Sequence, residues 1–172
     1  MTEAQKLIKK YGKEEASCVL ATGEKNDCVV RAVSHAFEVD YADAHHFCEH
    51  KLHRKTGNGV YTGRYMPSIT QAFGKKLKQL GRLTYTGKYR ILDRNRKSKE
   101  WVYDFDTNKT VLKFEMQKVK YKVGEFIKAY SKGNYIVIVR GHAFAVIDGK
   151  IFGNFLDDKR LTRQVKSAYK VN

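Results

Sequence analysis

The segment that most constrains the fold is an apolar run followed by a second strand and a tight turn. Residues Tyr135–Val139 are apolar throughout, which is typical of a strand buried on both faces at the centre of a sheet. The next segment, His142–Ile147, is also apolar apart from its histidine, and the Asp148-Gly149 pair that follows is a strong signal for a β-hairpin. The sequence therefore predicts an antiparallel sheet in the C-terminal part of the chain.

This hairpin has two common registers. If the Asp-Gly pair alone forms the loop, His142 faces Phe155. If the preceding isoleucine joins the loop and the glycine forms a left-handed bulge, His142 faces Asn154. We prefer the longer loop, because it pairs apolar residues with each other and places an amide beside the imidazole, and a catalytic imidazole needs a partner that fixes its tautomer. The alternative partners of the histidine are Asp157 and Asp158.

A helix with a cysteine in its first turn is predicted over Asn26–Phe37. Asn26 or Asp27 is suited to cap its N-terminus. Cys28 then lies where the helix dipole and the backbone N–H groups favour an anion, an environment that lowers the pKa of a thiol, although the charge of Asp27 opposes this. The apolar residues of the segment recur at helical spacing and are expected to face a core: Val29, Ala32, Val33, Ala36 and Phe37.

The remaining elements follow from spacing and from turn-forming residues. An extended segment is predicted over Ala16–Leu20, with Cys18 as a small buried hydrophobe. Alternating residues predict antiparallel strands between Leu83 and Met116, and residues 54–65 are predicted to form a glycine-rich loop. The other predicted helices are Thr2–Tyr11, Tyr41–His53, Val123–Ser131 and a helix that begins at Pro67 and ends before Gly81.

The helix predicted over Tyr41–His53 raises the question of a metal site. His46 and His50 share a face, but no second ligand pair with zinc-finger spacing follows. Cys48 belongs to an apolar stripe and is expected to point inward. We therefore predict no metal site and no cofactor, and a helix whose outer face is rich in histidine. The helix carries these potential ligands: His45, His46, Cys48, His50 and His53.

Length, charge and cysteine usage narrow the class of protein. The chain of 172 residues has the length of one domain, which we place over residues 1–172. Its formal net charge of +16 favours contact with nucleic acid or with an acidic protein. The three cysteines have no disulfide spacing, and the sequence shows neither an apolar run that could span a membrane nor a secretory leader. We therefore expect a cytosolic protein that makes no membrane contact. A basic loop between Tyr89 and Trp101 suits single-stranded nucleic acid: Arg94, Arg96, Lys97 and Lys99.

Two motifs, in this order along the chain, resemble those of the papain-like cysteine hydrolases. In Asp27–Ser34 a cysteine precedes apolar residues, an Arg-Ala pair and a serine, which is similar to the nucleophile segment of ovarian-tumour-type deubiquitinases. Gly141–Val146 resembles the histidine strand of the wider group, which includes bacteriocin-processing and cell-wall peptidases. Residues 24–170 also resemble uncharacterised papain-like proteins encoded by bacteriophages.

This resemblance implies an α+β, papain-like fold in which N-terminal helices pack on a C-terminal antiparallel β-sheet. It also implies that Cys28 is the nucleophile, that His142 is the general base and then the acid, and that Asn154 orients the histidine. Papain-type enzymes place a glutamine before the cysteine. This chain has none there, so Asn26 and the backbone N–H of Cys28 would donate to the oxyanion.

Two functions are compatible with the sequence. The first is a phage-encoded thiol hydrolase that acts in the host cytoplasm without a cofactor and cleaves a peptide, isopeptide or amide bond of a protein or peptide substrate. The alternative is the same fold without the chemistry, a basic protein that binds nucleic acid or an acidic host protein through the loop at Arg94–Lys99. The joint presence of Cys28 and His142 favours the enzyme, because the fold would have to bring both residues to one point.

Overall fold

A computed structural model gives the structure of the chain, and it divides into two compact units. The first comprises Met1–Leu83 and Lys122–Asn172, and the second comprises Thr84–Tyr121, where the sequence predicts one domain. The structure describes every residue except residues 1, 56, 82, 92–99, 105–108, 114–115 and 154–160. The basic residues Arg94, Arg96, Lys97 and Lys99 and the predicted orienting residue Asn154 therefore lie outside the described residues.

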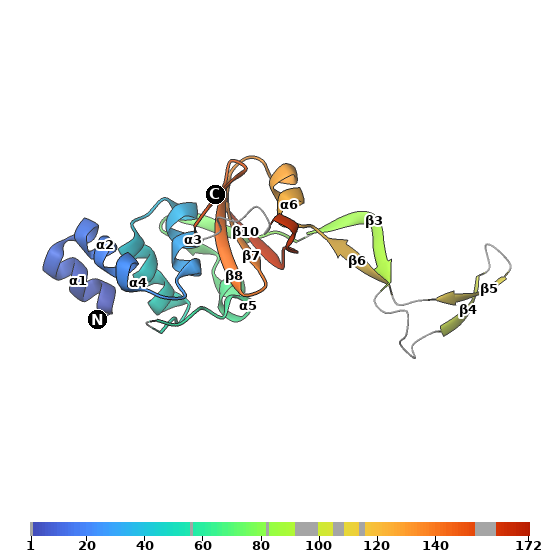
Figure 1. Ribbon diagram of the computed structural model, residues 1–172, viewed down its shortest axis with the longest axis horizontal. Coiled ribbons are helices and arrows are strands. Elements are labelled where there is room, and N and C mark those ends of the chain that lie inside the picture. Colours follow the sequence, from blue (N-terminus) through green and yellow to red (C-terminus); the bar gives the residue numbers. More distant parts are fainter. Residues whose placement is uncertain are drawn as a thin grey trace. The chain divides into compact units, whose positions relative to one another are not determined.

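The first unit contains an antiparallel sheet with the strand order β1-β2-β10-β7-β8-β9 (Figure 1). β7 and its neighbour β8 lie inside the sheet and are buried almost throughout, so the prediction of a central apolar strand in a C-terminal antiparallel sheet is confirmed. The strands are β1 (Gln71–Ala72), β2 (Lys75–Gln79), β7 (Asn134–Val139), β8 (His142–Ile147), β9 (Lys150–Phe152) and β10 (Ser167–Val171).

The helices of this unit lie mostly before the sheet in sequence, which agrees with the predicted α+β class. α3 packs on β7, β8 and β9 on one side and on α4 on the other, while α1 and α2 pack on α4 and on each other (Figure 1). The helices are α1 (Glu3–Tyr11), α2 (Lys13–Gly23), α3 (Cys28–Phe37), α4 (Tyr41–Lys51), α5 (Thr62–Tyr65), the 3₁₀ turn η1 (Met66–Ser68) and α6 (Val123–Ala129). Among the described residues, none of the helices has the length and apolar character needed to cross a membrane.

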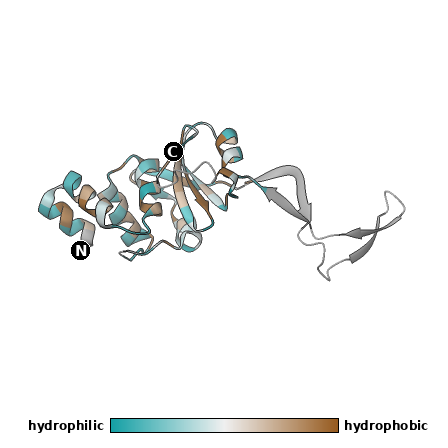
Figure 2. Ribbon diagram, viewed as in Figure 1, coloured by the Kyte–Doolittle hydropathy of each residue, from teal (hydrophilic) through white to brown (hydrophobic). Residues whose placement is uncertain are grey.

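The main core lies between α3 and the sheet, and hydrophobic residues follow the strands and the inward helix faces (Figure 2). On β8 the two alanines Ala143 and Ala145 face α3, opposite Ile138 and Ile136 of β7. Alternation puts Tyr135 on the other face of the sheet, where Phe126 of α6 meets its ring edge-on at 5.7 Å. The buried face of α3 consists of Val29, Val30, Ala32, Val33, Ala36 and Phe37, which confirms the predicted helical stripe.

The second unit consists of two pairs of antiparallel strands, as the alternating sequence pattern predicts. β3 (Thr84–Ile91) pairs with β6 (Met116–Lys120), with a shift of register between Thr84 and Tyr89. β4 (Glu100–Asp104) pairs with β5 (Lys109–Lys113).

Two predicted elements are wrong. Residues Ala16–Leu20 belong to helix α2 rather than to an extended segment, because Ala16 and Leu20 are one helical turn apart and pack against Ala4 and Ala42. As a consequence, Cys18 is exposed instead of buried.

The second wrong element is the helix predicted after Pro67. The proline does lie in the 3₁₀ turn η1, but the following residues form β1 and β2, joined by a turn in which Phe73 and Gly74 take positive φ angles of 51° and 74°. β2 also pairs with β10, which is more than eighty residues away in sequence. Pairing with a distant strand overrides the local helical spacing.

The hairpin between β8 and β9 has the shorter of the two loops considered. Ile147 pairs with Lys150 and Ala145 with Phe152, and Asp148 and Gly149 take φ angles of 45° and 78°. Two successive positive φ angles are what a type I′ turn requires, and this turn matches the twist of the strands better than the bulged loop. The preferred three-residue loop is therefore wrong, and with it the register that faced His142 toward Asn154.

Substitution of Gly149 tests the type I′ turn. We expect Gly149→Ala to lower the free energy of unfolding by about 1–2 kcal/mol, because an L residue at this φ angle is strained. The control is Gly59→Ala, at a position without a positive φ and without a heavy atom near the added Cβ, which should stay within about 0.5 kcal/mol of the wild type. Urea unfolding measures both, and equal stabilities for the two variants would contradict the I′ turn.

Candidate active site

Cys28 is the first residue of α3 and is half-buried. The residue before it, Asp27, occupies the N-cap position, but its side chain makes no capping hydrogen bond. Its carboxylate instead accepts hydrogen bonds from Arg31 Nε at 2.7 Å and from the hydroxyl of Tyr41 at 2.9 Å. Asp27 is thus turned toward α4, away from the role of cap.

The packing of α3 brings Cys28 against the first residues of β8. Ala143 and Ala145 present only methyl groups to α3, so the backbone of the helix can approach the strand closely. The backbone N–H of Ala143 lies close enough to the Cys28 sulfur to favour its thiolate. In the described part of the chain, the ladder between β8 and β9 ends at the pair Ala145–Phe152, so this N–H lies beyond it.

His142, the predicted base, is the first residue of β8 and the neighbour of Ala143 in sequence. It pairs with Val139 across the turn between β7 and β8. Its Nε2 atom is buried, and its ring lies 6.4 Å from that of Phe144, two residues along the strand. The structure therefore brings the start of α3 against the strand that carries the histidine, through the backbone of Ala143. The side chain of His142 itself alternates to the face of Phe144, opposite the face on which Ala143 meets α3.

Burial raises the pKa of the Cys28 thiol above its ordinary value. The N–H groups of Ala143 and Val29 stabilise the thiolate and oppose this rise, whereas the negative charge of Asp27 adds to it. The predicted lowering of the pKa is therefore wrong, because desolvation of the sulfur outweighs the helix N-terminus. A thiol of this kind needs a base to take its proton before it can attack a carbonyl.

Asn26, predicted to donate to an oxyanion, takes a positive φ of 57°. Its Nδ2 donates to the carbonyl of Gly57 at 3.2 Å, in the glycine-rich segment. The residue thus ties the turn before Cys28 to this segment.

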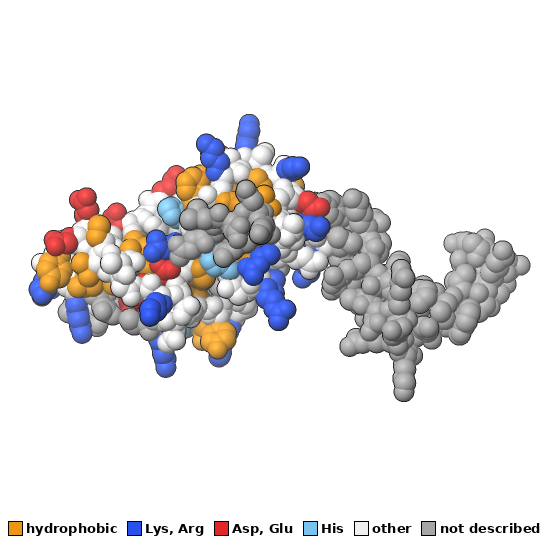
Figure 3. Space-filling view, in the orientation of Figure 1, with side chains coloured by type: hydrophobic (Ala, Val, Ile, Leu, Met, Phe, Trp, Pro, Cys, Tyr) orange, Lys and Arg blue, Asp and Glu red, His pale blue; other side chains and the backbone are white. Residues whose placement is uncertain are grey.

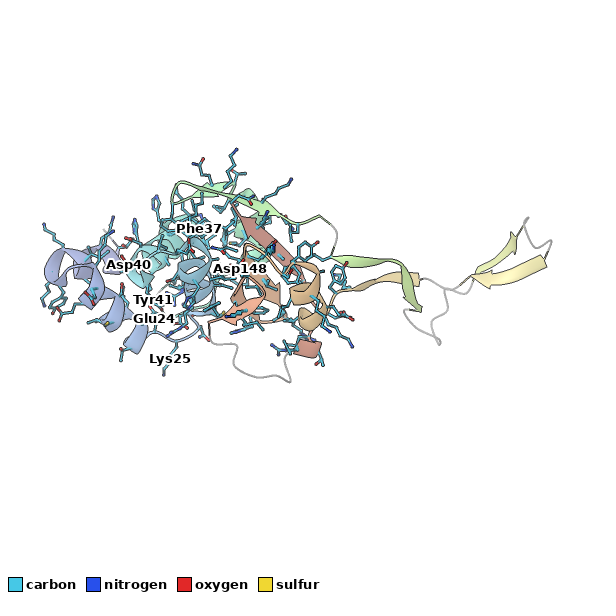
Figure 4. The ribbon with its side chains drawn as sticks, turned by 90° about the horizontal axis from the view of Figure 1, so that it is seen from above. Glu24, Lys25, Phe37, Asp40, Tyr41 and Asp148 are labelled. Carbon is cyan, nitrogen blue, oxygen red and sulfur yellow. The ribbon has the colours of Figure 1, made fainter. Side chains whose placement is uncertain are left out.

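A buried ionic cluster holds the other end of the same turn, and sequence reasoning missed it. Arg54 Nη2 donates to Glu24 Oε2 at 2.5 Å and to the carbonyl of Lys25 at 3.3 Å. His45 Nε2 lies 2.8 Å from Glu24 Oε1, and its Nδ1 lies 3.4 Å from a carboxylate oxygen of Glu49. Glu24, Lys25 and Tyr41 lie together beside α3 in Figure 4. Arg54 therefore anchors the turn from one side, opposite the bonds that Asp27 makes.

His45 corrects the predicted histidine-rich outer face of α4, since it is fully buried. The neighbouring His46 and His50 do stay near the surface, with their rings stacked at 5.9 Å, and Cys48 is buried as predicted. A signal for the buried histidine was available, because His45 lies one turn from both Tyr41 and Glu49. Among the residues that the structure describes, no group of three His, Cys, Asp or Glu side chains could hold a metal ion.

Arg54→Ala tests the anchoring role of the cluster. The substitution leaves the carboxylate of Glu24 buried without its cation, so we expect the free energy of unfolding to fall by about 3–5 kcal/mol. The control is Lys55→Ala, an exposed neighbour, which should change it by less than about 0.5 kcal/mol. A loss below about 1 kcal/mol in Arg54→Ala, by chemical denaturation, would show that the cluster does not hold the turn.

The same cluster predicts a dependence on pH. Burial would raise the pKa of Glu24, but the hydrogen bonds and charges of Arg54 and His45 outweigh it and lower the pKa to about 2. A pKa that is lower in the folded than in the unfolded chain adds stability above pH 4.5, and this stability is lost as the pH falls toward 2. We expect the urea midpoint of the wild type to fall more steeply over this interval than that of Glu24→Gln, which lacks the titrating group. Parallel curves would contradict the pKa shift.

No family model, curated protein or solved structure matches this chain. The geometry of Cys28, Ala143 and His142 therefore has to be judged on its own chemistry.

Proposed function

We propose that the chain is a papain-like thiol hydrolase that cleaves a peptide, isopeptide or amide bond. The observation that carries the proposal is the packing of α3 on β8, which brings the Cys28 thiol close to the backbone N–H of Ala143, the residue that follows His142. A cysteine at a helix N-terminus, packed on the first residues of a histidine-bearing strand, suits nucleophilic catalysis.

The proposed reaction is acyl transfer through a thioester. His142 takes the proton of the Cys28 thiol as the sulfur attacks the carbonyl carbon, and the π electrons move to the carbonyl oxygen. The backbone N–H of Cys28 and the amide of Asn26 donate to this oxyanion. When the tetrahedral intermediate collapses, the C–N bond breaks and the imidazolium gives its proton to the leaving amine. Water, deprotonated by the histidine, then attacks the thioester and regenerates the thiol.

For the partner that orients the imidazole of His142 we propose Asp157 or Asp158, because the observed register of the β8–β9 hairpin removes the reason for choosing Asn154. The raised pKa of Cys28 fits general-base catalysis, in which the proton leaves during the attack, better than a preformed thiolate. The three free thiols suit a reducing compartment, for which we propose the cytoplasm of a phage-infected host.

A second candidate is a protein that keeps this fold without the chemistry. The observation that favours it is the same raised pKa of Cys28, which on its own describes an inert buried thiol. Such a protein would act through its basic surface on nucleic acid or on an acidic host protein.

Alkylation of the three cysteines separates the two candidates. Iodoacetamide rates are measured by peptide mass spectrometry over a range of pH, with the exposed Cys18 and the fully buried Cys48 as internal references. If His142 acts as the base, Cys28 reacts faster than Cys18 at neutral pH in spite of its burial, and His142→Ala removes this advantage. If Cys28 reacts more slowly than Cys18 in both proteins, the enzyme is excluded.

Hydrolysis is then measured on a library of fluorogenic peptide amides. We expect Cys28→Ala and His142→Ala to lower the rate of amine release by at least about 1,000-fold, because each removes a member of the reacting pair. Cys18→Ala, the matched control on the exposed side of α2, should keep the wild-type rate. Equal rates in Cys28→Ala and Cys18→Ala would contradict the nucleophile.

A further inference from the structure

The sheet of the first unit carries three lysines on the face turned away from α3. Lys78 of β2 lies directly opposite Lys170 of β10, and Lys76 lies two residues from Lys78 on the same strand. Residues opposite each other, or two apart on one strand, share a face of a sheet. We call Lys76, Lys78 and Lys170 the lysine face.

The alternate residues of the same strands establish which side this is. Leu77 and Val171, which pair with each other, belong to the core beneath α3, so the lysine face is the opposite one. Lys76 and Lys78 are exposed, and Lys170 is half-buried. The stem of Lys170 runs over Gly133, since a Cβ added there would lie 3.6 Å from the lysine Cε. In Figure 4 long side chains with nitrogen tips stand out from the edge where β2 (green) runs.

The positive charges of the lysine face are not neutralised by ion pairs among the residues that the structure describes. Two like charges directly opposite on neighbouring strands repel and destabilise the pair. Among the residues that the structure describes, no ion pair involves any of the three lysines. The neighbour Lys75 differs, because its Nζ contacts Glu38 at 2.6 Å and the carbonyl of Phe37 at 3.0 Å.

The residues that pair with the lysine face on its other sides are neutral, and the one carboxylate described nearby, that of Asp148, accepts a hydrogen bond from the N–H of Gly133 at 2.8 Å. Gln71 pairs with Lys76 across β1, and Tyr135 pairs with Lys170 across β7. Asn172 exchanges backbone hydrogen bonds with Lys76 at 2.8 and 2.9 Å. The face therefore combines an unfavourable cluster of cations with amide groups, and an anionic partner would remove the repulsion.

The chemistry of the surface indicates which anion this is. The exposed large hydrophobic residues that the structure describes are Tyr11, Val19, Tyr61, Phe73 and Phe152, and none of them belongs to the rows of β2, β10 and β7 that form the lysine face. A protein partner uses apolar or aromatic anchors, and single-stranded nucleic acid uses aromatic side chains for stacking. Contacts to a duplex backbone need only cations and polar donors.

We propose that the lysine face binds the phosphate backbone of double-stranded DNA without sequence preference. The excess of 34 Lys and Arg over 18 Asp and Glu supplies the long-range attraction, and Figure 3 shows more basic than acidic side chains among the coloured atoms of the face in view. This site is separate from the candidate active site, so its failure or success does not depend on Cys28.

The test compares two triple variants of the full chain on a short DNA duplex of mixed sequence. Lys76→Gln, Lys78→Gln and Lys170→Gln are combined in one protein, and the matched control combines Lys6→Gln, Lys9→Gln and Lys55→Gln at exposed positions away from the face. The dissociation constant is measured by fluorescence anisotropy at several salt concentrations. If each lysine of the face contacts a phosphate, removing all three makes the negative slope of log K against log salt shallower by about 2.7. The control variant should leave the slope nearly unchanged.

A charge reversal keeps the test independent of folding. Lys78→Glu turns the repulsive pair with Lys170 into an attractive one, so the urea midpoint should rise while the affinity for duplex DNA falls at least tenfold relative to the control Lys55→Glu. A variant that is more stable but binds worse cannot have lost binding through misfolding.

Three results would overturn the proposal. Equal changes of slope in the two triple variants would show a diffuse charge effect. Tighter binding of single-stranded than of duplex DNA, with the same loss in the lysine variant, would show a different nucleic acid partner. Displacement of the duplex by polyglutamate at the same charge concentration would show an acidic protein as the partner.

Discussion

The close packing of α3 on β8 is the contact on which the first unit depends. It unites the buried face of the helix with the centre of the sheet, and it works because β8 presents Ala143 and Ala145 where larger residues would hold the helix away. The same closeness has a chemical consequence. It lets a backbone N–H of the strand reach the sulfur of Cys28, and it also buries that sulfur enough to raise its pKa. The core of the fold and the state of the candidate nucleophile therefore have one physical cause.

The turn before Cys28 is held by charges rather than by apolar packing. At the start of the turn, the carboxylate of Glu24 is bound by Arg54 and His45. At its end, the carboxylate of Asp27 is bound by Arg31 and Tyr41. Buried ion pairs contribute little net stability, because desolvation offsets most of the attraction, but removing one partner is costly, so the pair here holds the turn to one position. A turn that is defined in this way suits a residue whose reactivity depends on placement within a fraction of an ångström.

Sequence patterns predicted the elements whose signals are local. The apolar run of β7, the stripe of α3 and the Asp-Gly turn each depend on neighbours in the chain, and the structure contains all three, although the turn has the two-residue loop and not the preferred three-residue one. The helix expected after Pro67 failed because β2 gains its backbone partners from β10, at the other end of the sequence. The buried position of His45 was missed for a similar reason: its partners Glu24 and Arg54 come from segments on either side of α4.

The sequence by itself determined the class of the protein: a basic chain with helices before an antiparallel sheet, a cysteine at a helix start and a histidine at a strand start. Periodicity and turn residues act over a few positions, so they can be recognised without a structure. Only the tertiary structure decided the pKa of the thiol, since burial depends on what packs over the sulfur. The tertiary structure also decided where the lysine side chains lie. A helix would have scattered them, whereas strand pairing sends Lys75 to Glu38 and gathers Lys76, Lys78 and the distant Lys170 on one face, because the side-chain period of a strand is two and its neighbours are set by the sheet.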